Sequence, residues 1–297
     1  MTNSLHPSSE TWLSWRWALA TLVYYVTVCL AHLQFSLWLV RGRDTFMGRM
    51  AFAELVPYVA VVGGVGLLGW IAWQLRRSER PVLTTGMWLL WLASAVMIDQ
   101  YLTFSTNEYA HYPQYALLAW LVARTLDAQR RRWVVGQVLF WTTLMGMGDE
   151  LLQYLWITTS YSDYLDFNDF LTNLVAAAAG MLLYYGATPL PTIRPTRGQP
   201  VLAWSVTGAL CLAIVLAMQS GVLAVTPADK VPPGGIQTAA DGSRRLYLQR
   251  GPDFYGGKQK GPRHGEYHVL APLPGLAIML VLGAVFAGYG RFRKDQS

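Results

Sequence analysis

Charged side chains are scarce in this chain of 297 residues. Asp, Glu, Lys and Arg together make up 13% of it, whereas hydrophobic residues make up 53%. A soluble domain carries about 25% charged residues, roughly twice this share. One water-soluble core of this size cannot hide so much apolar side chain. The composition therefore excludes a soluble enzyme, a disordered chain and a nucleic-acid binder, and it predicts a polytopic membrane protein.

Cysteine is also nearly absent from the sequence. Only Cys29 and Cys211 occur, both within apolar segments, so we expect neither a disulfide nor a zinc finger. The N-terminus lacks a basic region, and no A-x-A cleavage site follows the first apolar run. These features predict a retained membrane helix rather than a signal peptide.

Eight apolar stretches approach the length of about 20 residues that a helix needs to cross a bilayer. They are Trp17–Val40, Ala51–Leu75, Val82–Phe104, Tyr112–Thr125, Trp133–Ile157, Phe170–Gly186, Val201–Val225 and Leu270–Gly290. We expect an all-α membrane bundle of about eight transmembrane helices, with seven helices and a re-entrant segment as the alternative. The predicted parts are N-terminal helices in 1–98, core helices in 99–186, and in 187–297 a helix pair that flanks a long extracytoplasmic loop, 226–269.

Arginine placement predicts the orientation of these helices. The second, fourth and sixth connections and the C-terminal tail are basic, whereas Ser105–His111 and Thr158–Asp169 contain no Lys or Arg. By the positive-inside rule the basic loops and both termini are cytoplasmic. The first connection, with Arg41, Arg43 and Arg49, disagrees with the rule. The long outer loop holds two alternating runs, Arg245–Gln249 and Glu266–Leu270, which predict a small hairpin.

Polar residues gather in the outer halves of the fourth, fifth and sixth stretches. Ionisable groups within membrane spans are costly, so each is a functional candidate. Many of them are three or four residues apart and share a helix face. The candidates are Glu108, His111 and Tyr115, then Asp149, Glu150 and Gln153, then Asp169 and Asn173. Asp169 could also cap the sixth helix, and the run Ala176–Gly180 would let another helix approach closely.

Three motifs in this region resemble those of the VanZ-like bacterial integral membrane proteins. They are N-E-Y-A-H-Y-P-Q-Y, G-D-E-L-L-Q-Y and D-F-N-D-F-L-T-N-L-V-A-A-A-A-G. Matching positions are Glu108, His111, Tyr115, Glu150, Gln153, Asp169, Asn173 and Gly180, whereas Asp163 and Ala176 replace a usual arginine and glycine. The resemblance covers roughly Asp99–Gly186. It implies a protein of the bacterial cell envelope and inner membrane, glycopeptide resistance for the family's namesake, and no established reaction.

The candidate residues permit more than one chemistry. Imidazole and carboxylates could hold a divalent metal, but no H-E-x-x-H or Cys/His spacing occurs, so we expect no metal and no other cofactor. Glu150, Asp149 and His111 are the candidates for acid–base catalysis, although no nucleophile stands beside His111 in the sequence. The two short outer loops, Ser105–His111 and Thr158–Asp169, contain no Lys or Arg. Unless another outer loop folds over them, the site favours a cationic, amine-bearing or hydroxylated ligand.

The interpretation we favour is non-catalytic binding or shielding of an envelope component at the outer face. The partners would be the lipid bilayer and an envelope precursor or other membrane subunits, but no nucleic acid. One alternative is a membrane-embedded hydrolase or transferase acting on a lipid-linked substrate. Another is an accessory subunit of a larger complex, whose polar residues only tie helices together. We expect the fourth to sixth helices to be neighbours, with His111, Gln153 and Asn173 facing one another around an open polar pocket.

Overall fold

The computed structural model describes residues 9–41, 52–157, 163–189, 198–224 and 235–290, and the protein is mostly helical, with 72% helix. The long helices are α1 (Ser9–Arg41), α2 (Phe52–Arg77), α3 (Pro81–Tyr101), α4 (His111–Leu126), α5 (Val135–Leu152), α6 (Phe167–Tyr185), α7 (Gly198–Gln219) and α9 (Pro272–Gly288). Shorter elements are the 3₁₀ helix η1 (Thr106–Ala110), the π-helix η2 (Gln153–Ile157) and α8 (Pro252–Tyr255). Each predicted apolar stretch thus contains a long helix.

Length and hydropathy single out fewer membrane-crossing helices than the eight expected. Among the described residues, only Pro81–Tyr101 and Val201–Gln219 are long and apolar enough to cross a membrane, and Pro272–Gly288 is apolar but shorter. By this measure eight transmembrane helices are not supported. The physical reason lies in the helices themselves: α4 has 16 residues, while α5 and α6 carry several of the polar candidate residues, which lowers their hydropathy.

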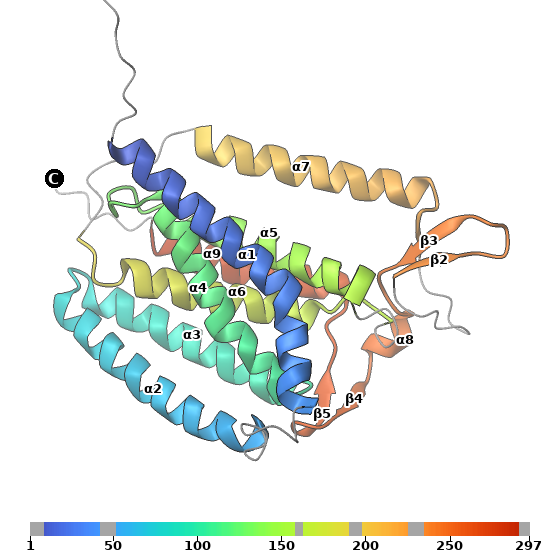
Figure 1. Ribbon diagram of the computed structural model, residues 1–297, viewed down its shortest axis with the longest axis horizontal. Coiled ribbons are helices and arrows are strands. Elements are labelled where there is room, and N and C mark those ends of the chain that lie inside the picture. Colours follow the sequence, from blue (N-terminus) through green and yellow to red (C-terminus); the bar gives the residue numbers. More distant parts are fainter. Residues whose placement is uncertain (1–8, 42–51, 158–162, 190–197, 225–234, 291–297) are drawn as a thin grey trace, which may run out of the picture.

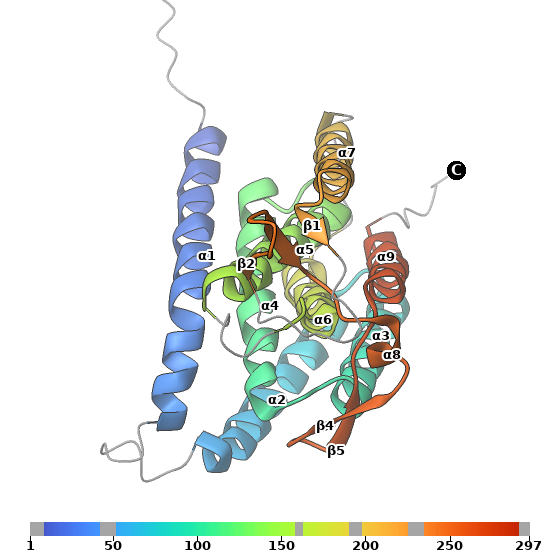
Figure 2. The ribbon, with the colours of Figure 1, turned by 90° about the vertical axis from the view of Figure 1, so that its right-hand side faces the viewer.

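Helix α6 lies at the centre of the bundle. Nearly all of its side chains from Asn168 to Tyr185 are buried, and α3, α4, α5 and α9 pack around it (Figure 2). The prediction that Ala176–Gly180 admits another helix closely is confirmed for α4. A Cβ atom placed on Gly180 would lie only 2.0 Å from the backbone oxygen of Ala116, so only glycine permits this approach.

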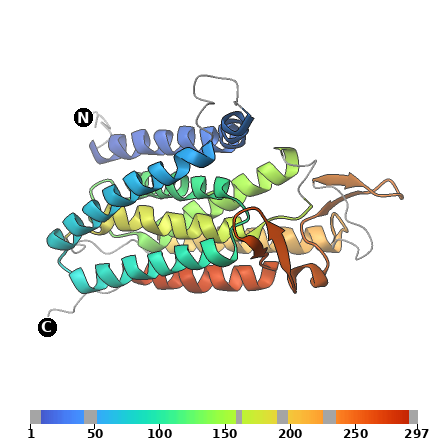
Figure 3. The ribbon, with the colours of Figure 1, turned by 90° about the horizontal axis from the view of Figure 1, so that it is seen from below.

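The two ends of the bundle differ in chemistry. At one end the guanidinium of Arg80 lies 4.4 Å from the ring centre of Trp133, and that of Arg124 lies 4.5 Å from the ring centre of Trp17. All of the described strands lie at the opposite end, together with the turn from α3 to α4 (Figures 1 and 3). The loops from α2 to α3 and from α4 to α5 are therefore separated from the strands by the length of the helices.

The strands form two small sheets rather than the hairpin that we expected. Strand β3 (Arg244–Tyr247) lies between β1 (Leu223–Ala224) and β2 (Ile236–Thr238), parallel to the first and antiparallel to the second. Strand β4 (Lys258–Gly261) pairs antiparallel with β5 (Gly265–His268). The predicted pairing of Arg245–Gln249 with Glu266–Leu270 is therefore wrong. Each run instead pairs with a nearer strand across a tight turn, helped by glycines with positive φ, +77° at Gly242 and +82° at Gly265.

Asn168, at the start of α6, joins three distant parts of the chain. Its Nδ2 donates to the carbonyl oxygens of Leu102 and His268, at 2.8 and 2.7 Å. Its Oδ1 accepts from the backbone N–H of Leu270 at 2.9 Å. Because Asn168 is only 2% exposed, these bonds fix the end of α3, the end of β5 and the approach to α9 around the start of α6.

Large apolar side chains cover much of the outer surface of the helices. Val62 of α2, Leu89 of α3, Trp204 of α7 and Leu280 of α9 are 73%, 61%, 75% and 65% exposed. Exposed apolar surface on several neighbouring helices marks a membrane or protein interaction surface. Apolar side chains thus fill the core around α6 and also cover the exterior of the bundle, whereas the exterior of a soluble helical domain is mostly polar.

Candidate functional site

Three residues from three helices meet near the strand-bearing end of the bundle. His111 begins α4, Glu150 lies near the end of α5, and Asp169 lies in the first turn of α6. One ligand atom from each lies within 4.8 Å of the others. His111 and Glu150 are buried and Asp169 is half-buried. We call these three residues the three-helix cluster. Because α4, α5 and α6 all pack against one another, the predicted neighbourhood of these helices is confirmed.

Asn173 of α6 orients two members of the cluster. Its Oδ1 lies 2.7 Å from Nδ1 of His111, and its Nδ2 donates to Oε1 of Glu150 at 3.3 Å. Because an ionised carboxylate only accepts hydrogen bonds, the amide nitrogen faces Glu150 and the amide oxygen faces His111. Nδ1 of His111 is then the donor to that oxygen. The expected meeting of His111 and Asn173 is confirmed, whereas the part assigned to Gln153, half-buried in η2, stays a prediction.

Asp149 and Tyr115 form a second buried pair beside the cluster. The Tyr115 hydroxyl donates to Oδ2 of Asp149 at 2.7 Å, and the Tyr115 ring stacks on that of His111, with 5.9 Å between ring centres. Asp149 is 0% exposed, and its Oδ1 accepts no hydrogen bond from the described residues. A buried carboxylate oxygen without a donor is costly. The pair therefore supports the His111 ring and adds negative charge behind it.

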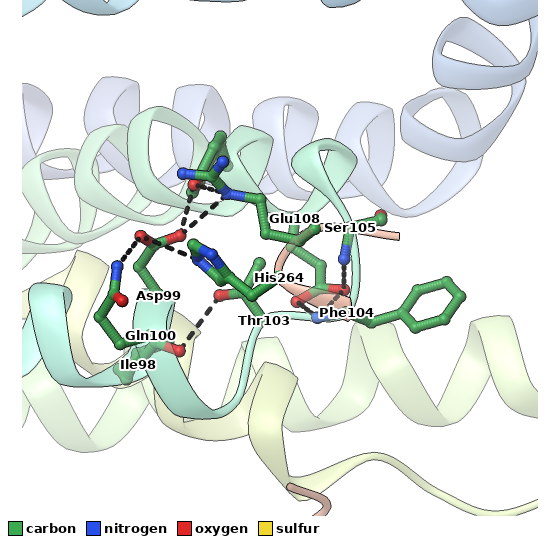
Figure 4. A network of polar contacts seen from close by, with 10 residues as sticks. Ile98, Asp99, Gln100, Thr103, Phe104, Ser105, Glu108 and His264 are labelled. Carbon is green, nitrogen blue, oxygen red and sulfur yellow. Dashed lines mark hydrogen bonds and ion pairs between the residues drawn. The ribbon is translucent and has the colours of Figure 1, made fainter. Parts of the chain in front are cut away.

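Glu108 and Asp166 lie on the outer side of the cluster. Glu108 accepts hydrogen bonds from the backbone N–H groups of Phe104 and Ser105, each at 3.0 Å from its Oε1 (Figure 4). Burial, followed by the negative charges of Asp169 and Asp166, raises the pKa of Glu108 to about 9. Burial, and then the charge of Asp169, raises the pKa of Asp166 to about 8. In the folded protein both carboxyl groups therefore retain their protons at neutral pH.

Asp166, not Asp169, caps α6. Oδ1 of Asp166 accepts from the backbone N–H of Asn168 at 2.8 Å, so the expected cap at Asp169 is wrong. The helix begins at Phe167, three residues before the predicted Phe170, which moves Asp169 into the first turn. Within the described residues, no hydrogen bond or ion pair engages the Asp169 carboxylate, which leaves it available to a ligand.

The described segment between α7 and α9 brings cations to this end of the bundle, but several of them pair with acidic residues outside the cluster. Arg250 pairs with Asp163. Asp163 is the residue that stands where the VanZ-like pattern usually has arginine. Arg263 lies 3.3 Å from Asp99, which also contacts His264 at 3.4 Å (Figure 4) and accepts from Tyr109. In the described part of the chain, no Lys or Arg forms an ion pair with the three-helix cluster. Its two carboxyl groups therefore lack a cationic partner.

The polar region is more enclosed than the open pocket that we expected. His111 and Asn173 are 6% and 1% exposed, whereas Glu108, Gln153 and Asp169 are half-buried. A groove of about 460 Å³ is lined by Trp70, Pro113, Ala116, Leu117, Trp120 and Leu183, is largely apolar, and contains none of the candidate residues. The candidate site thus extends inward from half-buried carboxyl groups to a buried histidine.

Two contributions were missed by reasoning from the sequence. Asp166 stands three residues before Asp169, a spacing that could have indicated the true helix cap. Cys29 of α1 is buried, and its thiol lies near the Asp149 carboxylate, but no sequence signal links these residues across 120 positions. Comparison with known proteins adds no assignment, since no protein-family model, curated protein or solved structure matches this chain.

Proposed function

We propose that this chain is a multi-pass protein of the bacterial cytoplasmic membrane, VanZ-like in its middle third. In this proposal eight helices cross the bilayer and both termini are cytoplasmic. The apolar exterior of α2, α3, α7 and α9 supports it, as does the position of Arg80 and Arg124 at the end of the bundle opposite the strands.

At its outer end the protein binds or shields a cell-envelope component through the polar residues around α6. One observation carries this proposal: among the described residues, no Lys or Arg forms an ion pair with Glu150 or Asp169. Removing carboxylates from water without a partner is costly, so such groups take a proton or a cation. The component would therefore present a cationic, amine-bearing or hydroxyl group. Glycopeptide resistance is the phenotype that the family resemblance suggests.

One observation favours a second candidate function, that of an accessory subunit in a larger membrane complex. The bonds from His111 to Asn173 and from Asn173 to Glu150 join α4, α5 and α6 inside the bundle, as residues that serve only to tie helices together would. The enzyme alternative, a hydrolase or transferase using Glu150, Asp149 and His111, needs a nucleophile or an activated water beside these groups.

A matched pair of cysteine variants tests the orientation. Asn107→Cys in η1 and Gln129→Cys after α4 both replace exposed side chains, at the two opposite ends of the bundle. In a background without native cysteines, an impermeant thiol reagent should label the first in intact cells and the second only after lysis. The reverse pattern would place the candidate site on the cytoplasmic side and refute the proposed orientation.

A second pair tests ligand binding. Glu150→Gln keeps the size of the side chain but removes its charge, and Glu266→Gln makes the same change at an exposed residue of β5. Native mass spectrometry of the protein extracted from membranes should find an envelope component on the wild type and on Glu266→Gln, but not on Glu150→Gln. Retention by all three proteins, or by none, would contradict the proposed site. A chemically altered component, present only with an active Glu150, would favour the enzyme.

A further inference from the structure

We propose that His111, Glu150 and Asp169 bind one divalent transition-metal ion, with Zn²⁺ and Mn²⁺ as the best-matched ions. This inference identifies the cation at the three-helix cluster, and it rests on the proposed function in assigning a cation there. It departs from the sequence, in which no metal-binding spacing is present, because the three ligands come from three separate helices.

The spacing of the ligand atoms suits a metal ion. Two ligands that lie about 2.1 Å from Zn²⁺ at a tetrahedral angle are about 3.4 Å apart. One ligand atom from each of the three residues lies within 4.8 Å of the other two. Ligand atoms at the upper limit of 4.8 Å would have to approach by about 1.4 Å to reach this spacing. Because Nδ1 of His111 donates to Asn173, Nε2 is the ring nitrogen left to bind a metal. Three protein ligands would leave a further position for water or for a hydroxyl group of the envelope component.

The donor set and the charge indicate the class of ion. A histidine nitrogen with two carboxylates suits Zn²⁺ and Mn²⁺, whereas Ca²⁺ and Mg²⁺ prefer oxygen ligands alone. One divalent ion with a neutral His111 and ionised Glu150 and Asp169 forms a site with no net charge. Such neutrality removes the penalty of burying the carboxylates without a cation.

Residues behind the ligands support the same assignment independently. Asn173 bonds to both His111 and Glu150, the type of outer contact that orients metal ligands. Asp149 is fully buried, and its Oδ1 accepts no hydrogen bond from the described residues, whereas its Oδ2 accepts from Tyr115. A cation in the adjoining cluster would offset the cost of this one unpaired carboxylate oxygen.

The test uses the full-length protein, purified in detergent, stripped with a chelator and titrated with Zn²⁺ or Mn²⁺ alone. We expect one ion per chain by elemental analysis. Asp169→Asn and Glu150→Gln should each weaken binding more than 100-fold, because each removes a charged ligand. Asn173→Ala should weaken it 10- to 100-fold, as loss of an outer-shell contact does. His264→Asn, which alters an outer histidine near Asp99, is the matched control and should bind as the wild type does.

Failure of the wild type to bind either ion would overturn the proposal. So would equal binding by Asp169→Asn and the wild type, which would place the metal elsewhere. Asp169→Asn is the decisive variant because the described residues make no bond to this side chain, so the apo protein should melt at the wild-type temperature. Repeating the native mass spectrometry of the extracted protein in the presence of a chelator separates the two proposals. If the protein retains the envelope component but binds no metal, this inference is refuted and the proposed function still stands.

Discussion

Replacing Gly180 by alanine should separate α4 from α6. The added Cβ would lie 2.0 Å from the backbone oxygen of Ala116 and 2.7 Å from its carbonyl carbon. Real Cβ contacts essentially never fall below 3.0 Å, so one backbone must move by about 1 Å. Neither neighbour is a flexible side-chain end that could rotate away. A gap of this width sacrifices a quarter to a half of the van der Waals attraction along the contact.

The magnitude follows from two opposing effects. Alanine favours a helix over glycine by about 1 kcal/mol, whereas overpacking a rigid contact costs about 3 kcal/mol. The net loss of unfolding free energy should be about 2 kcal/mol. Gly86→Ala in α3 is the matched control, because a Cβ there has no neighbour within 4 Å; it should gain up to about 1 kcal/mol.

Reversible unfolding in mixed micelles, followed by tryptophan fluorescence, measures both variants. Because α4 carries His111 and α6 carries Asn173, the same shift should lengthen their 2.7 Å hydrogen bond and weaken the binding of Zn²⁺. If Gly180→Ala has the same free energy of unfolding as Gly86→Ala, the close contact between α4 and α6 is refuted. Lower stability with unchanged binding of Zn²⁺ would refute its link to the cluster.

Three further predictions concern the strand-bearing end of the bundle. The pKa values of Glu108 and Asp166, about 9 and 8, lie above the ordinary 4.5 and 3.8, so the folded state retains protons that the unfolded state releases. The resulting stability is fully present below about pH 4 and is lost as pH rises towards 9. The melting temperature of the wild type should therefore fall as pH rises through this range, and that of Glu108→Gln should fall less steeply. Asn168→Ala removes three partly buried hydrogen bonds and should cost about 3 kcal/mol in the same unfolding assay. A loss below about 1 kcal/mol would contradict its bridging role. Arg263→Gln removes a partly exposed ion pair with Asp99 and should lower the free energy of unfolding by less than about 1 kcal/mol. It should nevertheless increase proteolysis within 258–268. Unchanged proteolysis would show that this contact does not secure the hairpin of β4 and β5.

Much of the fold could be predicted because helix-forming stretches are coded locally. Apolar runs of the right length place the long helices, and the run ending at Gly180 marks the close approach to α4. The expected eight membrane-crossing helices are not matched by hydropathy, because the polar residues in α5 and α6 make these core helices less apolar than α3 and α7. Strand pairing failed for another reason: Arg245 and Glu266 lie in similar alternating patterns, and the positive-φ turns at Gly242 and Gly265 decide which strand each one meets.

Within the candidate site, the sequence indicates which residues are polar but not which of them meet. Helical spacing correctly placed His111 and Asn173 on facing sides of α4 and α6. It could not show that Glu150 turns towards them while the adjacent Asp149 turns to Tyr115. That division depends on the rotation of α5 about its axis, which packing against the other helices sets.

The three bonds of Asn168 also bear on the order in which the protein can be completed during synthesis. The Leu102 carbonyl leaves the ribosome well before Asn168, but the His268 carbonyl and the Leu270 N–H emerge about a hundred residues after it. Until then two of the three native hydrogen bonds of the amide cannot form, and α6 lacks its contact with α9. A nascent chain therefore cannot complete this end of the bundle before the last helix arrives. A chain cut short before His268 would leave two hydrogen bonds of the buried Asn168 side chain unmade beside the buried acids, and it would expose the face of α6 that α9 covers.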